Sequence, residues 1–307
     1  MQRNLHIQYL QRGQINDDRW NACINSADNG LIYAYTHYLD CMCDNWDALV
    51  MNDYEAVMPL PWRKKGGIHY IYHPYLTAQL GVFGKTPDGV LLEAFLKAIP
   101  RKFRYLDFPL NQQNLFPVPG FPLYQRSNYV LSLQRPYEEL SKAYRENIRR
   151  NIKKSNGYGC TVVKGFDADA IITLAKQQGT AVVSEKDFGN FRRLYAFLKQ
   201  KGLAETYGVL SGKKDLFASC VFFFSHKRAY YILVGNHPNG RTLGASHALI
   251  DAFIKDHAGQ DLLLDFEGSD LRNLAFFYSS FGAKEEKYAA IKMNRLPWWL
   301  KWVKSGV

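Results

Sequence analysis

Three carboxylates in this sequence lie near the predicted ends of strands, where each could act as a proton acceptor. Asp107 and Asp265 each follow a short apolar run and precede a phenylalanine, and Glu267 comes two residues after Asp265. A carboxylate so placed could take a proton from a reacting amine or bind the amine as a cation. Aspartate also caps turns well, and because Asp107 and Asp265 recur at matching positions, a structural role is the alternative for both. The candidate catalytic residues are Asp107 and Glu267. The position that corresponds to Glu267 in the first half of the chain holds Pro109.

Between Pro136 and Gly159 the sequence combines a regular apolar seam with a run of cations. The seam residues recur every four positions, as on one face of a helix: Leu140, Tyr144, Ile148 and Ile152. The cations, with Glu146 as the single anion among them, are Lys142, Arg145, Arg149, Arg150, Lys153 and Lys154. So uneven a helix favours phosphate binding, and an ordinary solvated face is the alternative. The candidate ligand-binding residues are Arg145, Arg149, Arg150 and Lys153.

A third set of candidates lies in the irregular polar segment from His73 to Gly81. Loops of this kind often carry binding residues on a rigid scaffold. Tyr75 and Gln79 are its candidates for substrate binding, and a surface loop with satisfied polar groups is the alternative. The sequence contains no Ser-His-Asp order, HExxH, P-loop or zinc cluster, which argues against a hydrolase, an ATPase and a metalloenzyme. We therefore expect no metal site.

Two stretches that would position these residues resemble each other. Residues 91–108 and 249–266 align without a gap at an offset of 158, and seven of the 18 positions are identical. Gly84-Lys85-Thr86 and Gly240-Arg241-Thr242 precede the two stretches. Identity, spacing and context together indicate an internal duplication. In each copy the pattern predicts a helix followed by a strand that is covered on both faces.

The segments before each of these helices also correspond. Ala48–Leu60 and Ile68–Tyr72 flank a turn in the first half, and Ala218–Phe224 and Ala229–Val234 flank one in the second. Each pair predicts a β-hairpin. The other predicted elements are helices at 18–43, 136–159, 167–179, 187–202 and 271–281 and a strand at 288–293.

The length and composition agree with two folded domains. At 307 residues, with 47% hydrophobic and 15% aromatic residues, the chain is longer than one core usually supports. We predict a mixed α/β (α+β) fold with a first domain at 1–132 and a second, opened by the basic helix, at 133–307. Each domain is expected to be a mixed, largely antiparallel sheet flanked by helices.

Charge and cysteine content bear on partners and compartment. A net charge of +11 favours polyanionic partners such as nucleic acid, nucleotide phosphates or lipid headgroups. The longest apolar run is too short to cross a bilayer, and the first residues lack the apolar stretch of a signal peptide. Five cysteines without a CxxC pair are typical of reduced thiols, so we expect a cytoplasmic protein. The tail around Trp298, Trp299 and Trp302 is expected to pack on the domain, with a membrane-surface contact as the alternative.

Three stretches of the second half are similar to motifs of a known family. The first resembles a basic helix that opens the family's second domain, the second its strand-then-helix step, and the third the close of that domain. They are Arg145–Lys154, Tyr230–Gly235 with Ala248–Ala252, and Asp265–Gly268 with Asn273–Phe277 and Phe281–Gly282. In the first half the likeness is thinner, with Met58–Pro61 matching a strand end. On these motifs the chain resembles the FemABX-like acyltransferases, which contain two tandem GNAT folds.

The resemblance implies an N-acyltransferase or aminoacyltransferase that moves an acyl group from acyl-CoA or aminoacyl-tRNA to an amine acceptor. The acceptor would be a small molecule or resemble a peptidoglycan precursor, and no cofactor would be bound tightly. tRNA is a candidate partner, because an aminoacyl-tRNA donor would suit the positive net charge of the chain. The oligomeric state stays open. A catalytically degenerate GNAT pair that binds a phosphate-bearing ligand is the alternative.

Two departures from GNAT motifs concern candidate binding residues. In classical GNAT enzymes an Arg/Gln-x-x-Gly-x-Gly/Ala loop presents backbone N–H groups to the coenzyme A pyrophosphate. The nearest match here, Arg241–Ser246, ends in serine, so Arg241 and Gly244 are candidate donor-binding residues and a plain strand-to-helix turn is the alternative. The family's phenylalanine-lysine pair is Phe277-Tyr278 here, which makes Tyr278 a further candidate for substrate binding.

Overall fold

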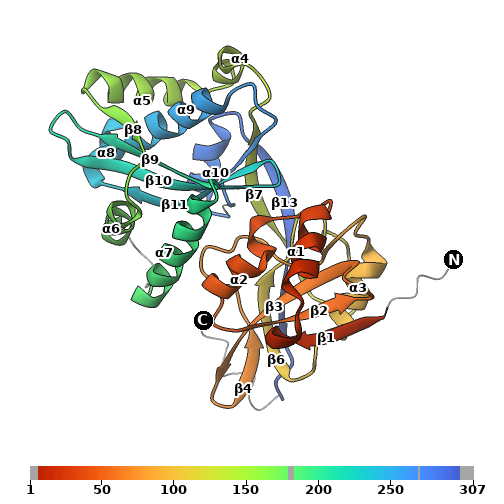
Figure 1. Ribbon diagram of the computed structural model, residues 1–307. Coiled ribbons are helices and arrows are strands. Elements are labelled where there is room, and N and C mark those ends of the chain that lie inside the picture. The colour runs from red at the N-terminus through yellow and green to blue at the C-terminus, as the bar shows by residue number, and fades with distance from the viewer. Residues whose placement is uncertain (1–5, 179–182, 269, 298–307) are drawn as a thin grey trace. The chain divides into compact units, whose positions relative to one another are not determined.

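The computed structural model describes residues 6–178, 183–268 and 270–297, so the tryptophans of the tail lie outside the described residues. The chain divides into two compact units, Met1–Arg126 with Lys287–Val307, and Ser127–Glu286 (Figure 1). Both units combine a mixed sheet with helices, which confirms the predicted fold class. Within the described residues, no helix is long and apolar enough to span a membrane.

The first unit is built on strands in the order β1-β2-β3-β4-β6-β13, with β5 beside β3. All neighbours in this order are antiparallel except β4 and β6, which are parallel. The strands are β1 (Ile7–Gln11), β2 (Trp46–Met51), β3 (Ala56–Lys65), β4 (Ile68–Ile71), β5 (Phe83–Gly84), β6 (Phe103–Pro109) and β13 (Lys284–Asn294). The helices are α1 (Asp17–Ser26), α2 (Thr36–Met42) and α3 (Gly89–Ala98), with short 3-10 turns at Arg12–Gln14 and Ile32–Ala34.

The second unit repeats this plan with strands in the order β8-β9-β10-β11-β12-β7. Again all neighbours are antiparallel except one pair, β11 and β12. The strands are β7 (Leu123–Ser132), β8 (Thr161–Lys164), β9 (Ala204–Leu210), β10 (Leu216–Ser225), β11 (Arg228–Asn236) and β12 (Leu263–Asp265). The helices are α4 (Tyr137–Lys142), α5 (Glu146–Gly157), α6 (Ala168–Gln178), α7 (Glu185–Gln200), α8 (Pro238–Leu243), α9 (Ala245–His257) and α10 (Arg272–Ser279).

The register of the two parallel pairs follows the offset found in the sequence. Tyr70 lies opposite Tyr105 in the first unit, and Arg228 lies opposite Leu263, 158 residues further on, in the second. Asp107 therefore has the same place in β6 that Asp265 has in β12. The expectation that these two aspartates are equivalent is confirmed, and internal duplication stays our interpretation of the shared plan.

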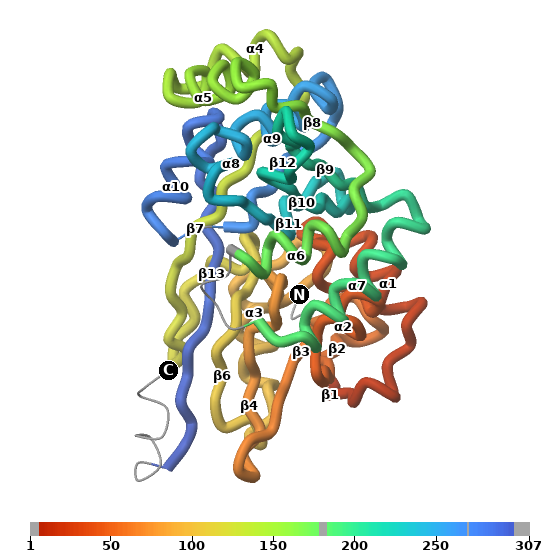
Figure 2. Tube along the Cα trace, turned by 90° about the vertical axis from the view of Figure 1, so that its left-hand side faces the viewer, coloured from red at the N-terminus to blue at the C-terminus, as the bar shows by residue number. Residues whose placement is uncertain are grey.

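Two helices cover opposite faces of the sheet in the second unit. Phe222 and Phe223 are consecutive on β10, so their side chains point to opposite faces. Phe222 stacks on Phe253 of α9 with ring centroids 3.7 Å apart, whereas Phe223 stacks on Phe191 of α7 at 5.7 Å. Figure 2 shows α5 beside α9 on the first face and α6 and α7 on the other. The basic helix therefore belongs to the outer layer of the face that α9 covers.

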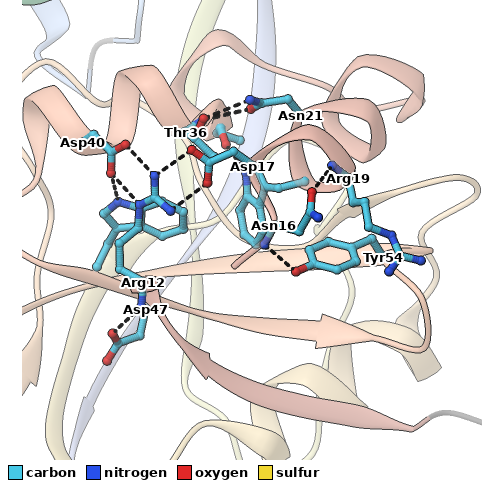
Figure 3. A network of polar contacts seen from close by, with 12 residues as sticks. Arg12, Asn16, Asp17, Arg19, Asn21, Thr36, Asp40, Asp47 and Tyr54 are labelled. Atoms are coloured by element: carbon cyan, nitrogen blue, oxygen red, sulfur yellow. Dashed lines mark hydrogen bonds and ion pairs between the residues drawn. The ribbon is translucent and has the colours of Figure 1, made fainter. Parts of the chain in front are cut away.

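A polar network ties the helices of the first unit to its first strands (Figure 3). The Arg12 guanidinium donates to Asp17 from Nη1 and to Asp40 from Nε, both at 2.7 Å, and lies 4.9 Å from the ring centroid of Trp46. Trp46 donates from its indole N–H to Asp40. One cation thereby joins the starts of α1 and β2 to α2.

Three predicted elements and the domain limits differ from the structure. The helical stretch predicted at 18–43 is α1 and α2, separated by residues that include the 3-10 turn Ile32–Ala34. Ala48–Leu60 is two strands, because residues 52–55 form a turn in which Asn52 and Tyr54 have left-handed backbones. The helix predicted at 136–159 is α4 and α5, because the N–H of Arg145 donates to the carbonyl of Ser280 and interrupts the helix. The predicted limits 1–132 and 133–307 miss the exchange of β13, which pairs with β6 of the first unit.

Candidate functional site

A buried charge cluster lies at the carboxyl end of β12. Arg228 donates to Asp265 at 2.8 Å and holds both carboxylate oxygens of Glu286, at 2.8 and 3.1 Å. Asn128 donates to Asp265 at 3.0 Å. The side chain of Asp265 is only 2% exposed and that of Arg228 12%. Burial raises the pKa of Asp265, and the charge of Arg228 opposes that rise.

This cluster fixes the turn that carries Glu267. The carboxylate of Asp265 accepts the backbone N–H of Glu267 at 2.8 Å. Glu267 has φ 61° and Gly268 φ 89°, so the chain turns sharply as it leaves β12. A non-glycine residue in this region is strained and needs such support. Asp265 thus has the structural role that the sequence left open for it.

Tyr278 of α10 shares this corner of the unit with Glu267. Its ring stacks on Phe266 with centroids 4.5 Å apart and lies 6.5 Å from the ring of Tyr129. Burial raises the pKa of Tyr278, and the nearby charge of Glu267 raises it further. The phenol therefore keeps its proton at neutral pH and is a hydrogen-bond donor.

The two parallel strands part at the same corner. β11 and β12 pair only from Arg228/Leu263 to Tyr230/Asp265, after which β11 continues to Asn236. Within the described residues, Tyr231, Leu233, Val234 and Gly235 of β11 pair in register with β10, and β12 does not extend beside them. An extended ligand could therefore lie along β11 between Tyr231 and Gly235.

Asp107, the counterpart of Asp265, is much less enclosed. Its side chain is 39% exposed, its Oδ2 accepts the Tyr105 hydroxyl at 3.1 Å, and Lys292 lies opposite it on β13 with Nζ at 3.8 Å. Burial and the charge of Asp107 raise the pKa of Tyr105 to about 12. A half-exposed carboxylate beside a lysine can still meet a substrate.

The polar loop before β5 has mainly structural contacts. Gln79 is 1% exposed, and its side-chain oxygen accepts the backbone N–H of Gln112 at 3.0 Å. His73 contacts the carbonyl of Thr77 at 2.5 Å, which closes the loop on itself. Tyr75 is half-buried in the same loop. The structure therefore accounts for Gln79 without a ligand.

The basic helix presents its cations outward. Tyr144 and Ile148 of the seam are buried, and Arg145, Arg149 and Lys153 are exposed. Two of the arginines also make protein contacts. Arg145 lies over the ring of Phe276 at 4.9 Å, and Nη2 of Arg149 donates to the carbonyl of Lys142 at 2.9 Å.

The cations of α5 divide between two surroundings. Arg149 and Lys153 line a shallow cavity of about 730 Å³ between α4 and α5. Arg150 and Lys154, one residue further along in each case, are exposed but do not line it. Of the four candidate cations, Arg149 and Lys153 therefore share this cavity, and Arg145 and Arg150 do not line it.

The glycine of the loop before α9 has a structural explanation. Gly244 has φ 74°, and a Cβ placed on it would lie 2.6 Å from the backbone oxygen of Asn151 in α5. Arg241 is exposed in α8, one turn away. Because α5 covers Gly244 so closely, the glycine is required by packing, whether or not a pyrophosphate approaches this loop.

Replacing Gly244 with alanine is expected to lower the free energy of unfolding by about 2–4 kcal/mol. The variant would combine a left-handed alanine with a clash against the α5 backbone. Gly159→Ala is the matched control, because Gly159 has φ 69° but nothing within 4 Å of its Cβ position. It should cost about 1–2 kcal/mol. Equal losses in urea titrations of the two variants would refute the close approach of α5.

Sequence reasoning missed Asn128, Arg228 and Glu286. The sequence pattern places Arg228 in a hairpin turn, although it is the first residue of β11. Its partners come from β12 and β13, and Asn128 of β7 donates to the same carboxylates, so the cluster joins strands that are distant in sequence. A charged residue opening an apolar strand was the one signal, and it does not identify the partners.

Part of the chain matches a known family model. Residues 142–272 match the family model of the GNAT acetyltransferase domain. A comparison with curated protein sequences gave no match.

Solved structures similar to this chain include the crystal structure of FemX. It has 13% sequence identity and a TM-score of 0.64, and the match covers 94% of this chain and 98% of FemX. L-PGS from Bacillus licheniformis matches at 12% identity and a TM-score of 0.55, over 91% of this chain and 92% of its own. The C-terminal domain of a putative lysylphosphatidylglycerol synthetase from Agrobacterium fabrum matches at 10% identity and a TM-score of 0.56, over 91% of each chain. The resemblance to the FemABX-like GNAT-fold proteins is thereby confirmed at the level of the fold, with the GNAT acetyltransferase domain itself at residues 142–272.

Proposed function

We propose that this protein is an N-acyltransferase or aminoacyltransferase that acts on an amine acceptor. The observation that carries the proposal is the parting of β11 and β12 inside the segment that matches the GNAT acetyltransferase domain. An extended donor arm can run along β11 between Tyr231 and Gly235, where β12 no longer accompanies it, and bring its acyl carbonyl to the corner that holds Glu267 and Tyr278. FemX and L-PGS share the fold, which agrees with acyl or aminoacyl transfer in general terms.

The proposed reaction is direct attack by the amine on the acyl carbonyl. The nitrogen forms a bond to the carbonyl carbon, a carboxylate takes the proton of the amine, and the thiolate or ribose oxygen of the donor departs. Tyr278 keeps its proton at neutral pH and can supply it to the departing atom. Glu267, which Asp265 holds in a strained turn, is the candidate base at this corner. The half-exposed Asp107 is the alternative base, which would place the reaction in the first unit.

For the donor we favour aminoacyl-tRNA over acyl-CoA. The exposed cations of α5 suit a polyanion, and α5 packs closely on the glycine of the loop that would have to receive a coenzyme A pyrophosphate. A tRNA donor also requires the protein to work in the cytoplasm. The acceptor would carry a free amine, as a peptidoglycan precursor does.

Turnover with a panel of donors tests the proposal. The full chain would be incubated with charged tRNAs or acyl-CoAs and pools of amines, and release of deacylated tRNA or free thiol would be measured. We expect amine-dependent release with charged tRNA. Donor binding without release under any combination would favour a catalytically degenerate GNAT pair that binds a phosphate-bearing ligand. The enclosure of Asp265 by Arg228 is the observation that suits this second candidate, since one of the two strand-end carboxylates is already committed to structure.

A further inference from the structure

The cavity between α4 and α5, which we call the α4–α5 groove, combines cations with an apolar floor. Three cations line it against one anion, Glu138, and the floor includes the half-buried side chains of Tyr137 and Ile152. Its volume of about 730 Å³ lies within the range of small-ligand sites, about 300–1,000 Å³. The three cations are Lys142, Arg149 and Lys153.

Arg149 is held in place before any ligand arrives. Its Nη2 donates to the carbonyls of Lys142 at 2.9 Å and Ser141 at 3.3 Å, which are the last carbonyls of α4. Among the described residues these are its only hydrogen-bond partners, so Nε and Nη1 can donate to a ligand. An arginine already fixed by the protein loses little freedom on binding, and its planar fork suits a phosphate.

The aromatic floor distinguishes this groove from a merely positive surface. The hydroxyl of Tyr137 donates to Asp251 of α9 at 2.8 Å, which fixes the ring at the floor. Unpaired nucleotides are bound by two kinds of group, aromatic rings and cations. A base can stack on the ring, and a phosphate can pair with the cation. Double-stranded nucleic acid offers no free base to such a floor.

We propose that the α4–α5 groove binds the unpaired end of an RNA, with a base on Tyr137 and a phosphate on Arg149 and Lys153. The inference rests on the proposed function, because the single-stranded end of a charged tRNA is the part that must reach the enzyme. It goes further by assigning that end to one groove and by separating the groove cations from Arg150 and Lys154 on the same helix.

The test uses two double variants that remove equal charge from one helix. Binding of a fluorescein-labelled eight-nucleotide single-stranded RNA ending in CCA would be followed by anisotropy over a range of salt concentrations. Arg149→Ala with Lys153→Ala should weaken binding about tenfold or more and reduce the slope of log affinity against log salt by about 1.4, since two phosphate contacts are lost at about 0.7 each. Arg150→Ala with Lys154→Ala should weaken binding less than about threefold, because only long-range attraction changes.

A third variant tests the floor. Tyr137→Leu should weaken RNA binding about five- to tenfold through loss of base stacking while leaving the salt slope unchanged. Because this change also removes the hydrogen bond to Asp251, urea unfolding would verify that the variant is folded at the assay temperature. If it is not, Ile152→Ser tests the same floor.

Four results would overturn the inference. The first two are equal losses in both double variants and no loss in either. The third is displacement of the RNA by coenzyme A as readily as by unlabelled RNA, which would make coenzyme A the source of the nucleotide, and the fourth is preference for anionic vesicles over RNA. Because the assay measures binding alone, a groove-specific defect in a protein that turns over no donor would refute the proposed function and leave this inference standing.

Discussion

Replacing Arg228 with methionine is expected to lower the free energy of unfolding of the second unit by about 3–5 kcal/mol. The change leaves the buried carboxylates of Asp265 and Glu286 next to each other without their shared cation. A buried charge that loses its partner cannot recover its hydration, so breaking the cluster costs more than the ion pair contributes. Urea titration monitored by circular dichroism would measure the loss. Lys227→Met is the control. Lys227 pairs with Asp261 at the exposed surface, so its loss should not measurably change the free energy of unfolding.

The loss in Arg228→Met should shrink as the pH falls. Burial already raises the pKa of Asp265 above its value in the unfolded chain, which is about 3.9. A group with a raised pKa in the folded state favours folding most below its unfolded pKa, and that contribution is lost as the pH rises through the folded pKa. Without Arg228 the pKa of Asp265 rises further. The variant should therefore be closer to the parent protein near pH 4.5 than at pH 7, and a deficit that does not vary with pH would contradict a buried, ionised Asp265.

Asparagine at position 107 should lower kcat of the proposed transfer reaction by about 100-fold or more, if Asp107 takes the proton of the amine. The half-exposed side chain has modest contacts, so the free energy of unfolding should change by less than about 1 kcal/mol. Turnover at saturating donor and acceptor, with parallel urea titrations, would measure both effects.

Asp265→Asn is the matched control for this experiment, because it makes the same chemical change at the equivalent place in the other unit. It should lower the free energy of unfolding by about 1.5–3 kcal/mol through the weakened contact with Arg228. The kcat of this variant should fall only through disturbance of the backbone turn at Glu267. Unchanged kcat in Asp107→Asn together with a large loss in Glu267→Gln would identify Glu267 as the base and refute the role of Asp107.

The sequence was sufficient for the elements whose signals are local. The helix and strand at 91–108 and 249–266 and both hairpins were found because apolar periodicity and turn residues lie within a few positions of each other. The break at Arg145 was missed because its cause, the carbonyl of Ser280, is far away in the chain. The same limit explains the buried charge cluster, because Asp265, Arg228, Asn128 and Glu286 stand on four different strands. Equivalent residues in a repeat need not share a role, since Lys292 stands beside Asp107 where Val130 stands beside Asp265.

The exchange of β13 has a consequence for the order in which the chain can fold on the ribosome. β6 emerges early, but the strand that covers its second edge begins 175 residues after β6 ends, 284 − 109. At about 5–20 residues per second, that edge waits roughly 9–35 s for its partner. An open strand edge can pair with another chain during this interval. The first unit is therefore the first to be synthesised and the last to be completed, and it is the part of the nascent chain that most needs protection from other strands.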